Sequence, residues 1–559
     1  MELRLLFAFI LMGVVLFLTP YFYKTVAPPV KKSVPMATTS QPATGAAAPA
    51  PPAAPAETAV TAAPENSGVP RVAATGEQLY AIDTDLFRIS FSNRGGVAKS
   101  WLLKKYRAHA GNPLELVNTA AKVERPFALY FPETKPATDV NQALYQARPD
   151  PDGLGVTFDF SDGNTAAHKV FRFSKSSYLS SVSTEVTVAG KPIPNLIEWR
   201  GGFGDIAVSD LSSVGQTLRF DVTDGKLVKN SAKSAKNGPV ITTGNYSFAG
   251  IEDKYFVAAF LPQHAGSAEL ATFSDSAPTV LDPKEIAFAG AAVGDGPVNH
   301  LELYVGPKDI DILRAVNPKL EQVVDFGWFS FLAKPLFLVV NWVMAHAVHN
   351  YGWSIILVTV VLNFILFPLK MTSMKSTKKM QALQPQIAGI NEKYKNIGLR
   401  DPRKAEQNQE VMDLYKKHGV NPMGGCVPML LQIPFFIAFY KVFSVSVEMR
   451  GAHWLWVTDL SQPETLPIHI LPVVMIASQF LMQKMTPPAT GGDPNQQRMM
   501  MFMPLIFGFM FYNFSSGLVL YYLTSNLVGI AQQLFFNRTS IAAVAAQSVQ
   551  PPKKRIGRK

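Results

Sequence analysis

The sequence predicts a polytopic α-helical membrane protein with six transmembrane helices and a large antiparallel β-sandwich domain outside the cytoplasm. Of 559 residues, 48% are hydrophobic and only 17% are charged, whereas soluble proteins average about 25% charged residues. Apolar runs long enough to cross a bilayer occur near the start of the chain and repeatedly after residue 325. Between them, polar and apolar residues alternate as they do in β-strands.

The first element is a transmembrane anchor over residues 1–24, whose apolar run is "LLFAFILMGVVLFLTPYFY". A cleaved signal peptide is the competing interpretation. No small-residue cleavage site directly follows the run, and Tyr21, Phe22 and Tyr23 are typical of an interfacial aromatic belt, so we expect the anchor to be retained. Residues 25–70 are dominated by Ala, Pro, Thr and Ser, a composition that cannot bury a core and predicts an extended linker.

Residues 71–325 are expected to form the β-sandwich domain. Stretches such as "LFRISFSN" and "GVTFDFSDG" alternate with period two and are separated by turn residues. No catalytic motif and no metal-ligand spacing stands out, so we expect no catalytic residues, no metal and no cofactor. Because Cys426 is the single cysteine, no intramolecular disulfide can stabilise the domain.

After residue 325 the chain becomes apolar and helical. Five further spans are predicted, at residues 351–369, 423–443, 466–485, 499–513 and 516–536. The segment 326–350 is also apolar, and charge decides its placement. The loop 370–422 and the tail 541–559 are rich in Lys and Arg, so the positive-inside rule places both in the cytoplasm.

One anchor plus five later spans satisfies both charge placements. The two termini then lie in the cytoplasm and residues 25–350 lie outside it, which in a bacterium is the periplasm. A further span at 326–350 would move the basic loop outside. We therefore expect this segment to be an interfacial helix anchored by Trp328 and Trp342, followed by a five-helix core over 351–540.

The basic loop 370–422 predicts an antiparallel helical hairpin. Met380, Leu383 and Ile387 recur at helical spacing, and Val411, Leu414 and His418 repeat the pattern after a break. The basic residues of the hairpin fit either a solvated surface or a contact with anionic lipid headgroups or ribosomal RNA.

Polar residues within the predicted spans are candidates for function. Thr359, Asn363 and Lys370 share one helical face. Gln432 lies within the next span, and the last span places Tyr522, Asn526, Gly529 and Gln533 at helical spacing. Such residues serve either as interhelical packing contacts or as the lining of a polar groove.

Two other function classes are disfavoured by what these spans lack. None of the five later spans contains Asp or Glu, which argues against an ion-coupled transporter. The spans also lack HExxH and GxSxG motifs, which argues against an intramembrane enzyme.

Three stretches of the helical region resemble the YidC family of bacterial membrane protein insertases. They are "NPMGGCVPMLLQIPFFIAFYKVF", "LPVVMIASQFLMQKM" and "MFMPLIFGFMFYNFSSGLVLYYLTSNLVGIAQQ". The similarity runs from about 350 to 536, with the basic hairpin before the first stretch. The architecture and "IEDKYFVAAFLP" imply the long Gram-negative form of the family.

The resemblance implies a non-enzymatic insertase of the bacterial inner membrane with a hydrophilic groove open to cytoplasm and lipid. It implies nascent membrane proteins, the Sec translocon, the ribosome (through the basic hairpin and tail) and the phospholipid bilayer as partners, without DNA. A polar tail of the incoming chain would enter the groove while its apolar segment slides into lipid. The groove residues implied by the matching positions are Thr359, Asn363, Gln432, Ile433, Pro434, Phe435, Tyr521 and Tyr522.

The sequence departs from the family pattern at one groove position. The family commonly has an arginine or lysine where this chain has Asn363, and the resemblance implies that this cation attracts acidic substrate residues. Lys370 lies on the same face about 10 Å nearer the cytoplasm, and we expect it to replace part of the missing charge.

The alternative function is a periplasmic binding or assembly factor that the helices merely anchor.

Overall fold

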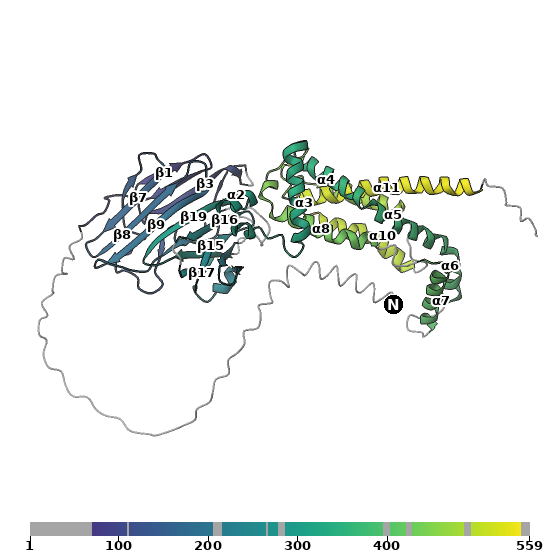
Figure 1. The fold of residues 1–559 in the computed structure, drawn as a ribbon, viewed down its shortest axis with the longest axis horizontal. Coiled ribbons are helices and arrows are strands. Elements are labelled where there is room, and N and C mark those ends of the chain that lie inside the picture. Colours follow the sequence, from purple (N-terminus) through teal and green to yellow (C-terminus); the bar gives the residue numbers. More distant parts are fainter. Residues whose placement is uncertain are drawn as a thin grey trace, which may run out of the picture. The chain divides into compact units, whose positions relative to one another are not determined.

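The computed structural model describes residues 70–108, 111–204, 215–263, 266–277, 285–394, 403–420, 427–485 and 494–548. The predicted anchor 1–24, the linker as far as residue 69 and the tail from residue 549 lie outside these ranges. Within them, a β-rich part comes first in the sequence and a helical part follows (Figure 1).

The β-rich part consists of three antiparallel sheets in the residues described. The first sheet has the order β1 (Leu79–Asp83), β2 (Phe87–Ser92), β3 (Val97–Arg107) and β4 (Pro113–Glu115). The largest has the order β13 (Lys226–Ser231), β12 (Gln216–Asp221), β15 (Tyr246–Glu252), β16 (Phe256–Pro262), β19 (Val298–Pro307), β9 (Leu179–Val188), β8 (Thr165–Phe173), β7 (Gly155–Ser161) and β6 (Gln146–Pro149), with β10 (Lys191–Pro192) paired to β9. The third has the order β14 (Val240–Gly244), β17 (Ala268–Ala277), β18 (Ile286–Gly294), β11 (Leu196–Trp199) and β5 (Leu129–Tyr130).

Aromatic side chains form the core between the sheets. Trp101 of β3 lies 5.7 Å from Trp199 of β11, and Phe171 of β8 lies 4.9 Å from both Phe91 and Phe127, measured between ring centroids. The alternation that predicted strands is visible in β8, where every second side chain is buried. The prediction of an antiparallel β domain is thus confirmed, because sheets that bury one face require this alternation.

A lysine occupies one of the inward positions of β8. Lys169 is fully buried, and its Nζ donates to the carbonyl oxygens of Gly95 and Phe127, at 2.7 Å each. Gly95 (φ +74°) and Phe127 (φ +74°) are both in the left-handed region. The lysine therefore ties together two tight turns whose carbonyls would otherwise lack donors in the core.

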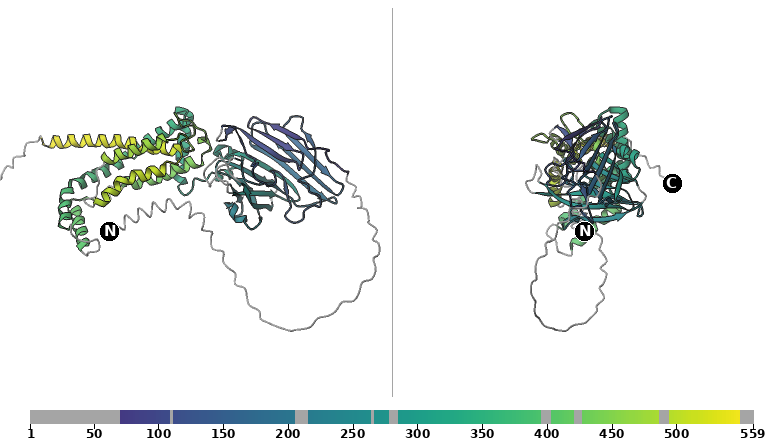
Figure 2. Two further views of the ribbon diagram at one scale, coloured as in Figure 1. Left: turned by 180° about the vertical axis from the view of Figure 1, so that it is seen from behind. Right: turned by 90° about the vertical axis from the view of Figure 1, so that its left-hand side faces the viewer.

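The helical part follows the last strand. Short helices α2 (Ile310–Val316) and η3 (Leu320–Val323) lead into it, and η6 (Val447–Met449) is a further single turn; η2 (Ala232–Ala235) belongs to the β-rich part, between β13 and β14. The longer elements are α3 (Ser330–Val343), the π-helical η4 (Met344–Val348), α4 (Tyr351–Ile365), α5 (Phe367–Ala382), α6 (Gln384–Lys393), α7 (Arg403–Lys417), α8 (Val427–Val445), α9 (Ile470–Met485), α10 (Pro494–Phe511) and α11 (Ser516–Ser548). Helices α4, α8, α9, α10 and α11 lie lengthwise beside one another (Figures 1 and 2).

Helix α4 is shorter than the predicted span 351–369. It ends at Ile365, and α5 leaves at an angle of 59°. Pro368 has no N–H to donate to the carbonyl of Phe364, which explains the break. The boundary predicted between 369 and 370 therefore lies inside α5, which runs on into the basic region.

By length and composition, one helix in the described part of the chain could cross a membrane, namely Ser330–Val348, which covers α3 and η4. The bent pair α4 and α5 would be a second, and α8 and α9 contribute shorter apolar segments. Ser330–Val348 is the segment for which we predicted an interfacial position. That placement and the total of six spans remain predictions.

The basic hairpin has its own small core. Met380, Leu383 and Ile387 pack against Tyr415 and Val420. His418, which continues the helical spacing in the sequence, is exposed, and Tyr415 is buried instead. Helix α7 ends at Lys417, and Gly419 closes it with φ +62°, so His418 no longer lies on the helical face.

Candidate functional site

Asn363 lies at the centre of a buried polar cluster formed by α4, α5, α8 and α11. Its side chain is 4% exposed, and its Nδ2 donates to the carbonyl oxygen of Thr359, at 2.8 Å. Its Oδ1 accepts from Nζ of Lys370 at 2.6 Å and from Oγ of Ser525 at 3.5 Å. Every polar atom of this amide thus has a partner, as burial requires.

Lys370 reaches Asn363 from the far side of the helix break. The two residues belong to α5 and α4, respectively, and the bond joins them across the 59° bend. No acidic side chain among the described residues forms an ion pair with Lys370. The ammonium therefore places an uncompensated positive charge next to the position where the family resemblance led us to expect one.

Gln432 of α8 joins the same cluster through α11. Its Nε2 donates to the hydroxyl oxygen of Tyr521 at 2.7 Å and to Oγ of Ser525 at 3.3 Å. Ser525 in turn contacts Asn363. The predicted residues Asn363, Lys370, Gln432 and Tyr521 are therefore connected by a continuous chain of hydrogen bonds.

The remaining predicted residues surround this chain without polar contact to it. Ile433, Pro434 and Phe435 are half-buried on α8. Tyr522 is also half-buried and packs on the ring of Phe511, 4.9 Å away, so its position is on a different face of α11 from that of Tyr521. These four residues are thus partly accessible and have no hydrogen bond to the polar cluster among the described residues.

Two residues of the cluster were not among those predicted, Ser525 and Gln532. Gln532 is 6% exposed, and its Nε2 donates to the backbone carbonyl oxygen of Asn363 at 3.0 Å. Tyr521, Ser525 and Gln532 follow at steps of four and seven, which places them on one face of α11. That spacing could have identified them.

The face of α11 that we predicted lies one residue further along and serves packing instead. Asn526 donates to Oγ of Ser478 in α9 at 3.1 Å, and Gln533 donates to Asn537 of its own helix at 3.2 Å. Gly529 faces Met482, because a Cβ built there would lie 2.9 Å from the methyl carbon of that side chain.

Two buried polar atoms of the cluster have no hydrogen-bond partner in the described residues: Oγ1 of Thr359 and Oε1 of Gln532. Thr359 is fully buried. The cluster therefore offers amide, hydroxyl and ammonium groups but no carboxylate. Groups of this kind can host peptide amides and acidic side chains, whereas metal ions need several His, Cys, Asp or Glu ligands, and the described residues contain no such group.

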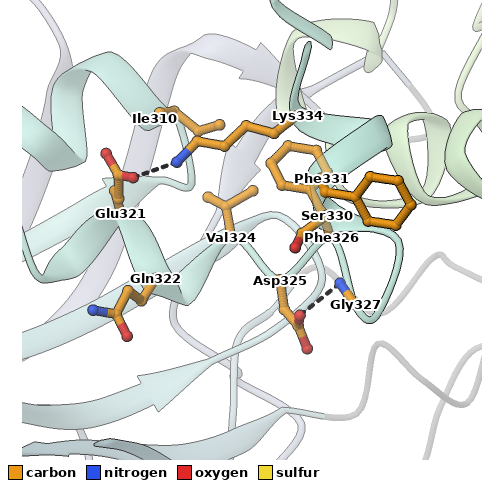
Figure 3. A pocket seen from close by; sticks show the side chains of 10 residues that line it. All are labelled: Ile310, Glu321, Gln322, Val324, Asp325, Phe326, Gly327, Ser330, Phe331 and Lys334. Carbon is orange, nitrogen blue, oxygen red and sulfur yellow. Dashed lines mark hydrogen bonds and ion pairs between the residues drawn. The ribbon is translucent and has the colours of Figure 1, made fainter. Parts of the chain in front are cut away.

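A separate cavity of about 400 Å³ lies where α3 begins (Figure 3). Glu321 accepts there from Lys334 at 2.5 Å, and Asp325 accepts from the backbone N–H of Gly327 at 2.7 Å. Phe331 extends along the rim. The lining shares no residue with the polar cluster, and its charged groups already have partners.

Comparison with known families divides the chain as its fold does. Residues 79–339 match the family described as YidC periplasmic domain, and residues 343–543 match the family described as 60Kd inner membrane protein. The first match covers the β-rich part and the second contains the whole polar cluster.

Curated relatives match over nearly the full length. The chain is 35% identical over 96% of its length to the membrane protein insertase YidC of Syntrophus aciditrophicus and covers 100% of that protein. It is also 35% identical over 98% of its length to the insertase of the same name from Geobacter metallireducens and covers 100% of it.

A crystal structure of an active YidC insertase aligns with 83% of this chain and 95% of its own, at 18% identity and a TM-score of 0.35. Identity above 30% over whole relatives is what establishes kinship here. The chain belongs to the YidC family of inner-membrane insertases, non-enzymatic proteins that insert newly made membrane proteins, and it carries the family's periplasmic domain.

Proposed function

We propose that this insertase receives the polar tail or loop of its substrate at the cluster of Asn363, Lys370, Gln432 and Ser525. The observation that carries the proposal is the ammonium of Lys370, held 2.6 Å from Oδ1 of Asn363 in a buried cluster without carboxylates. Such a site would attract an acidic tail, because charge-assisted hydrogen bonds strengthen where water is displaced.

Insertion at this site would need no covalent step. Moving peptide groups into hydrocarbon costs several kcal/mol for each group left without a partner, and amide and hydroxyl groups would lower that cost. The apolar segment of the substrate would pass along the half-buried Ile433, Pro434 and Phe435 of α8. Burial of its apolar surface in lipid would supply the driving force.

We further propose six transmembrane helices, cytoplasmic termini and periplasmic residues 25–350. The basic charge of 370–422 and of the tail supports this topology through the positive-inside rule. Residues 326–350 would lie at the outer interface, which the exposure of Trp328 (88%) and Trp342 (61%) supports, since Trp prefers the headgroup level.

The Sec translocon and the ribosome are the proposed partners beyond the substrate. Lys416 and Lys417 are exposed at the end of α7, next to His418. Clustered cations of this kind suit ribosomal RNA, and anionic lipid headgroups would compete for the same charges.

The test is insertion by the purified full-length chain in lipid vesicles, with a short membrane protein synthesised in their presence. Two substrates differ only in carrying an acidic or a neutral tail, and protease protection of the tail reports insertion. With Lys370→Ala, insertion of the acidic-tailed substrate should fall roughly tenfold, because a hydrogen bond to a charged group contributes about 1.5–3 kcal/mol. Insertion of the neutral-tailed substrate should change little.

Lys375→Ala is the matched control, since Lys375 is an exposed cation of the same helix. Asn363→Lys added to Lys370→Ala should restore insertion of the acidic tail. If the Lys370→Ala protein inserts each substrate as well as the unchanged protein does, the charge at this site does not select substrates.

A further inference from the structure

The bend between α4 and α5 needs support from another helix. Within a helix each backbone carbonyl has a partner, but a break at Leu366 followed by Pro368 leaves carbonyl oxygens without their usual donors. In a low-dielectric environment those groups must be satisfied by neighbouring elements.

Gln532 of α11 provides such support. Its Nε2 donates to the carbonyl oxygen of Asn363, in the last turn of α4, at 3.0 Å. The side chain is buried, and its other polar atom, Oε1, has no partner among the described residues. Among the described residues, this amide donates a hydrogen bond only to the backbone of α4. It is therefore placed to hold the helix end rather than to join the side-chain network.

Two further contacts hold α5 beyond the bend. The rings of Phe367 and Phe535 lie 6.5 Å apart at 60°, and Nζ of Lys378 lies 4.7 Å from the ring centre of Phe536. Phe535 and Phe536 lie three and four positions after Gln532, so one face of α11 contacts both sides of the break.

The bend matters because it brings Lys370 to Asn363. In a straight helix, residues seven positions apart are separated by about 10 Å along the axis, which is more than an extended lysine side chain covers. In the bent arrangement its Nζ lies 2.6 Å from Oδ1 of Asn363.

We propose that Gln532 is a positioning residue of the insertase: together with Phe535 and Phe536 it fixes the bend that places the Lys370 ammonium beside Asn363, and so sets the preference for acidic substrate tails. This inference deepens the proposed function and rests on it.

Spin labels test the bend directly. With Cys426 replaced by serine, labels at the exposed positions 357 and 379 report the distance between α4 and α5 in the purified full-length chain. Gln532→Leu should lengthen that distance, by up to about 4 Å if the helix straightens fully, and broaden its distribution. Phe535→Ala, which removes the ring contact with Phe367, should shift the distance less in the same direction.

Gln533→Leu is the matched control. Gln533 is buried on the same helix, but among the described residues its side chain donates a hydrogen bond only to Asn537 of that helix. It should leave the distance unchanged. An unchanged distance in Gln532→Leu, or an equal change in both variants, would overturn the proposal.

The ratio of acidic-tailed to neutral-tailed insertion gives the functional readout. Gln532→Leu should lower this ratio about threefold, and adding Asn363→Lys should restore it, since a lysine there needs no bend to place its charge. A lowered ratio that Asn363→Lys does not restore would overturn the proposal. If Lys370→Ala itself leaves the ratio unchanged, the proposed function is wrong, while the label distance still decides whether Gln532 holds the bend.

Discussion

Single residues of this chain perform tasks that their residue type alone does not reveal. Asn363 is an amide where the family commonly has a cation, and the structure places the ammonium of Lys370 against it. The proposed function assigns the missing charge to this lysine, seven positions away in the sequence. The two side chains are hydrogen-bonded to each other, which neither residue indicates when it is considered alone.

Glu198 is a second residue with an unusual environment. It lies in β11 with 3% of its surface exposed, and its Oε2 has no partner in the described residues. Burial raises its pKa from 4.5 to about 7; Arg200 opposes this, whereas Glu124 and Asp275 reinforce it. Between about pH 4.5 and 7 the folded domain therefore holds a proton that the unfolded chain releases.

We predict that Glu198→Gln makes the stability of the β domain less dependent on pH. Because the folded-state pKa is raised, this carboxyl contributes stability that is complete below about pH 4.5 and is lost as pH rises through about 7. The variant should match the unchanged protein near pH 5 and exceed it by about 3 kcal/mol at most at pH 8. Thermal unfolding of the solubilised full chain at both pH values measures this, and an identical difference at both would contradict it.

At the scale of elements, one helix face organises the site. Tyr521 and Ser525 of α11 meet Gln432 of α8, and Gln532 meets the end of α4. The adjacent face of α11, with Asn526 and Gly529, packs on α9 instead. The polar-cluster residues and the packing residues of α11 therefore lie on faces about 100° apart, which is the angle between successive residues of a helix.

The hairpin of α6 and α7 is the element whose stability can be changed by itself. Ile387 is 1% exposed and belongs to a small cluster separate from the main core. We predict that Ile387→Ala destabilises the hairpin by about 2–4 kcal/mol, as large-to-small core changes do. Hydrogen exchange should become faster in α6 and α7 and remain unchanged in β8.

Gly389→Ala is the matched control for the hairpin. A Cβ there meets no atom within 4 Å, and alanine favours a helix over glycine by about 1 kcal/mol. Exchange in α6 should therefore slow down. Faster exchange in both variants would mean that the hairpin is not held by the cluster around Ile387.

At the scale of the whole molecule, the polar cluster and the aromatic core lie in different parts of the chain. The residues of the polar cluster all lie between 359 and 532, and the β domain contributes none of them. The β domain contains its own aromatic core around Trp101 and Trp199. The geometry of the polar cluster should therefore not depend on the β domain.

We predict that a variant lacking residues 71–320 keeps more than half of the insertion activity in vesicles. The comparison is made at equal amounts of folded protein, measured after purification in detergent. Loss of nearly all activity would instead favour the alternative in which the periplasmic domain is the working part and the helices are its anchor.

The sequence by itself determined the β domain, the helical region, the family and several members of the polar cluster. Period-two alternation reports which face of a strand is buried, and apolar helical runs report burial along their length, so both are local signals. The same local signal placed Asn363 and Lys370 on one face and Gln432 in the next span.

Only the tertiary structure decided which polar residues meet. The sequence placed Gln533 and His418 at the right period but could not show that Gln532 and Tyr415 take the inner positions, because helix rotation and helix ends depend on partners distant in the chain. The bend at Leu366 likewise brings Lys370 to Asn363 through contacts with α11. Such contacts join residues more than 160 positions apart, and no local pattern encodes them.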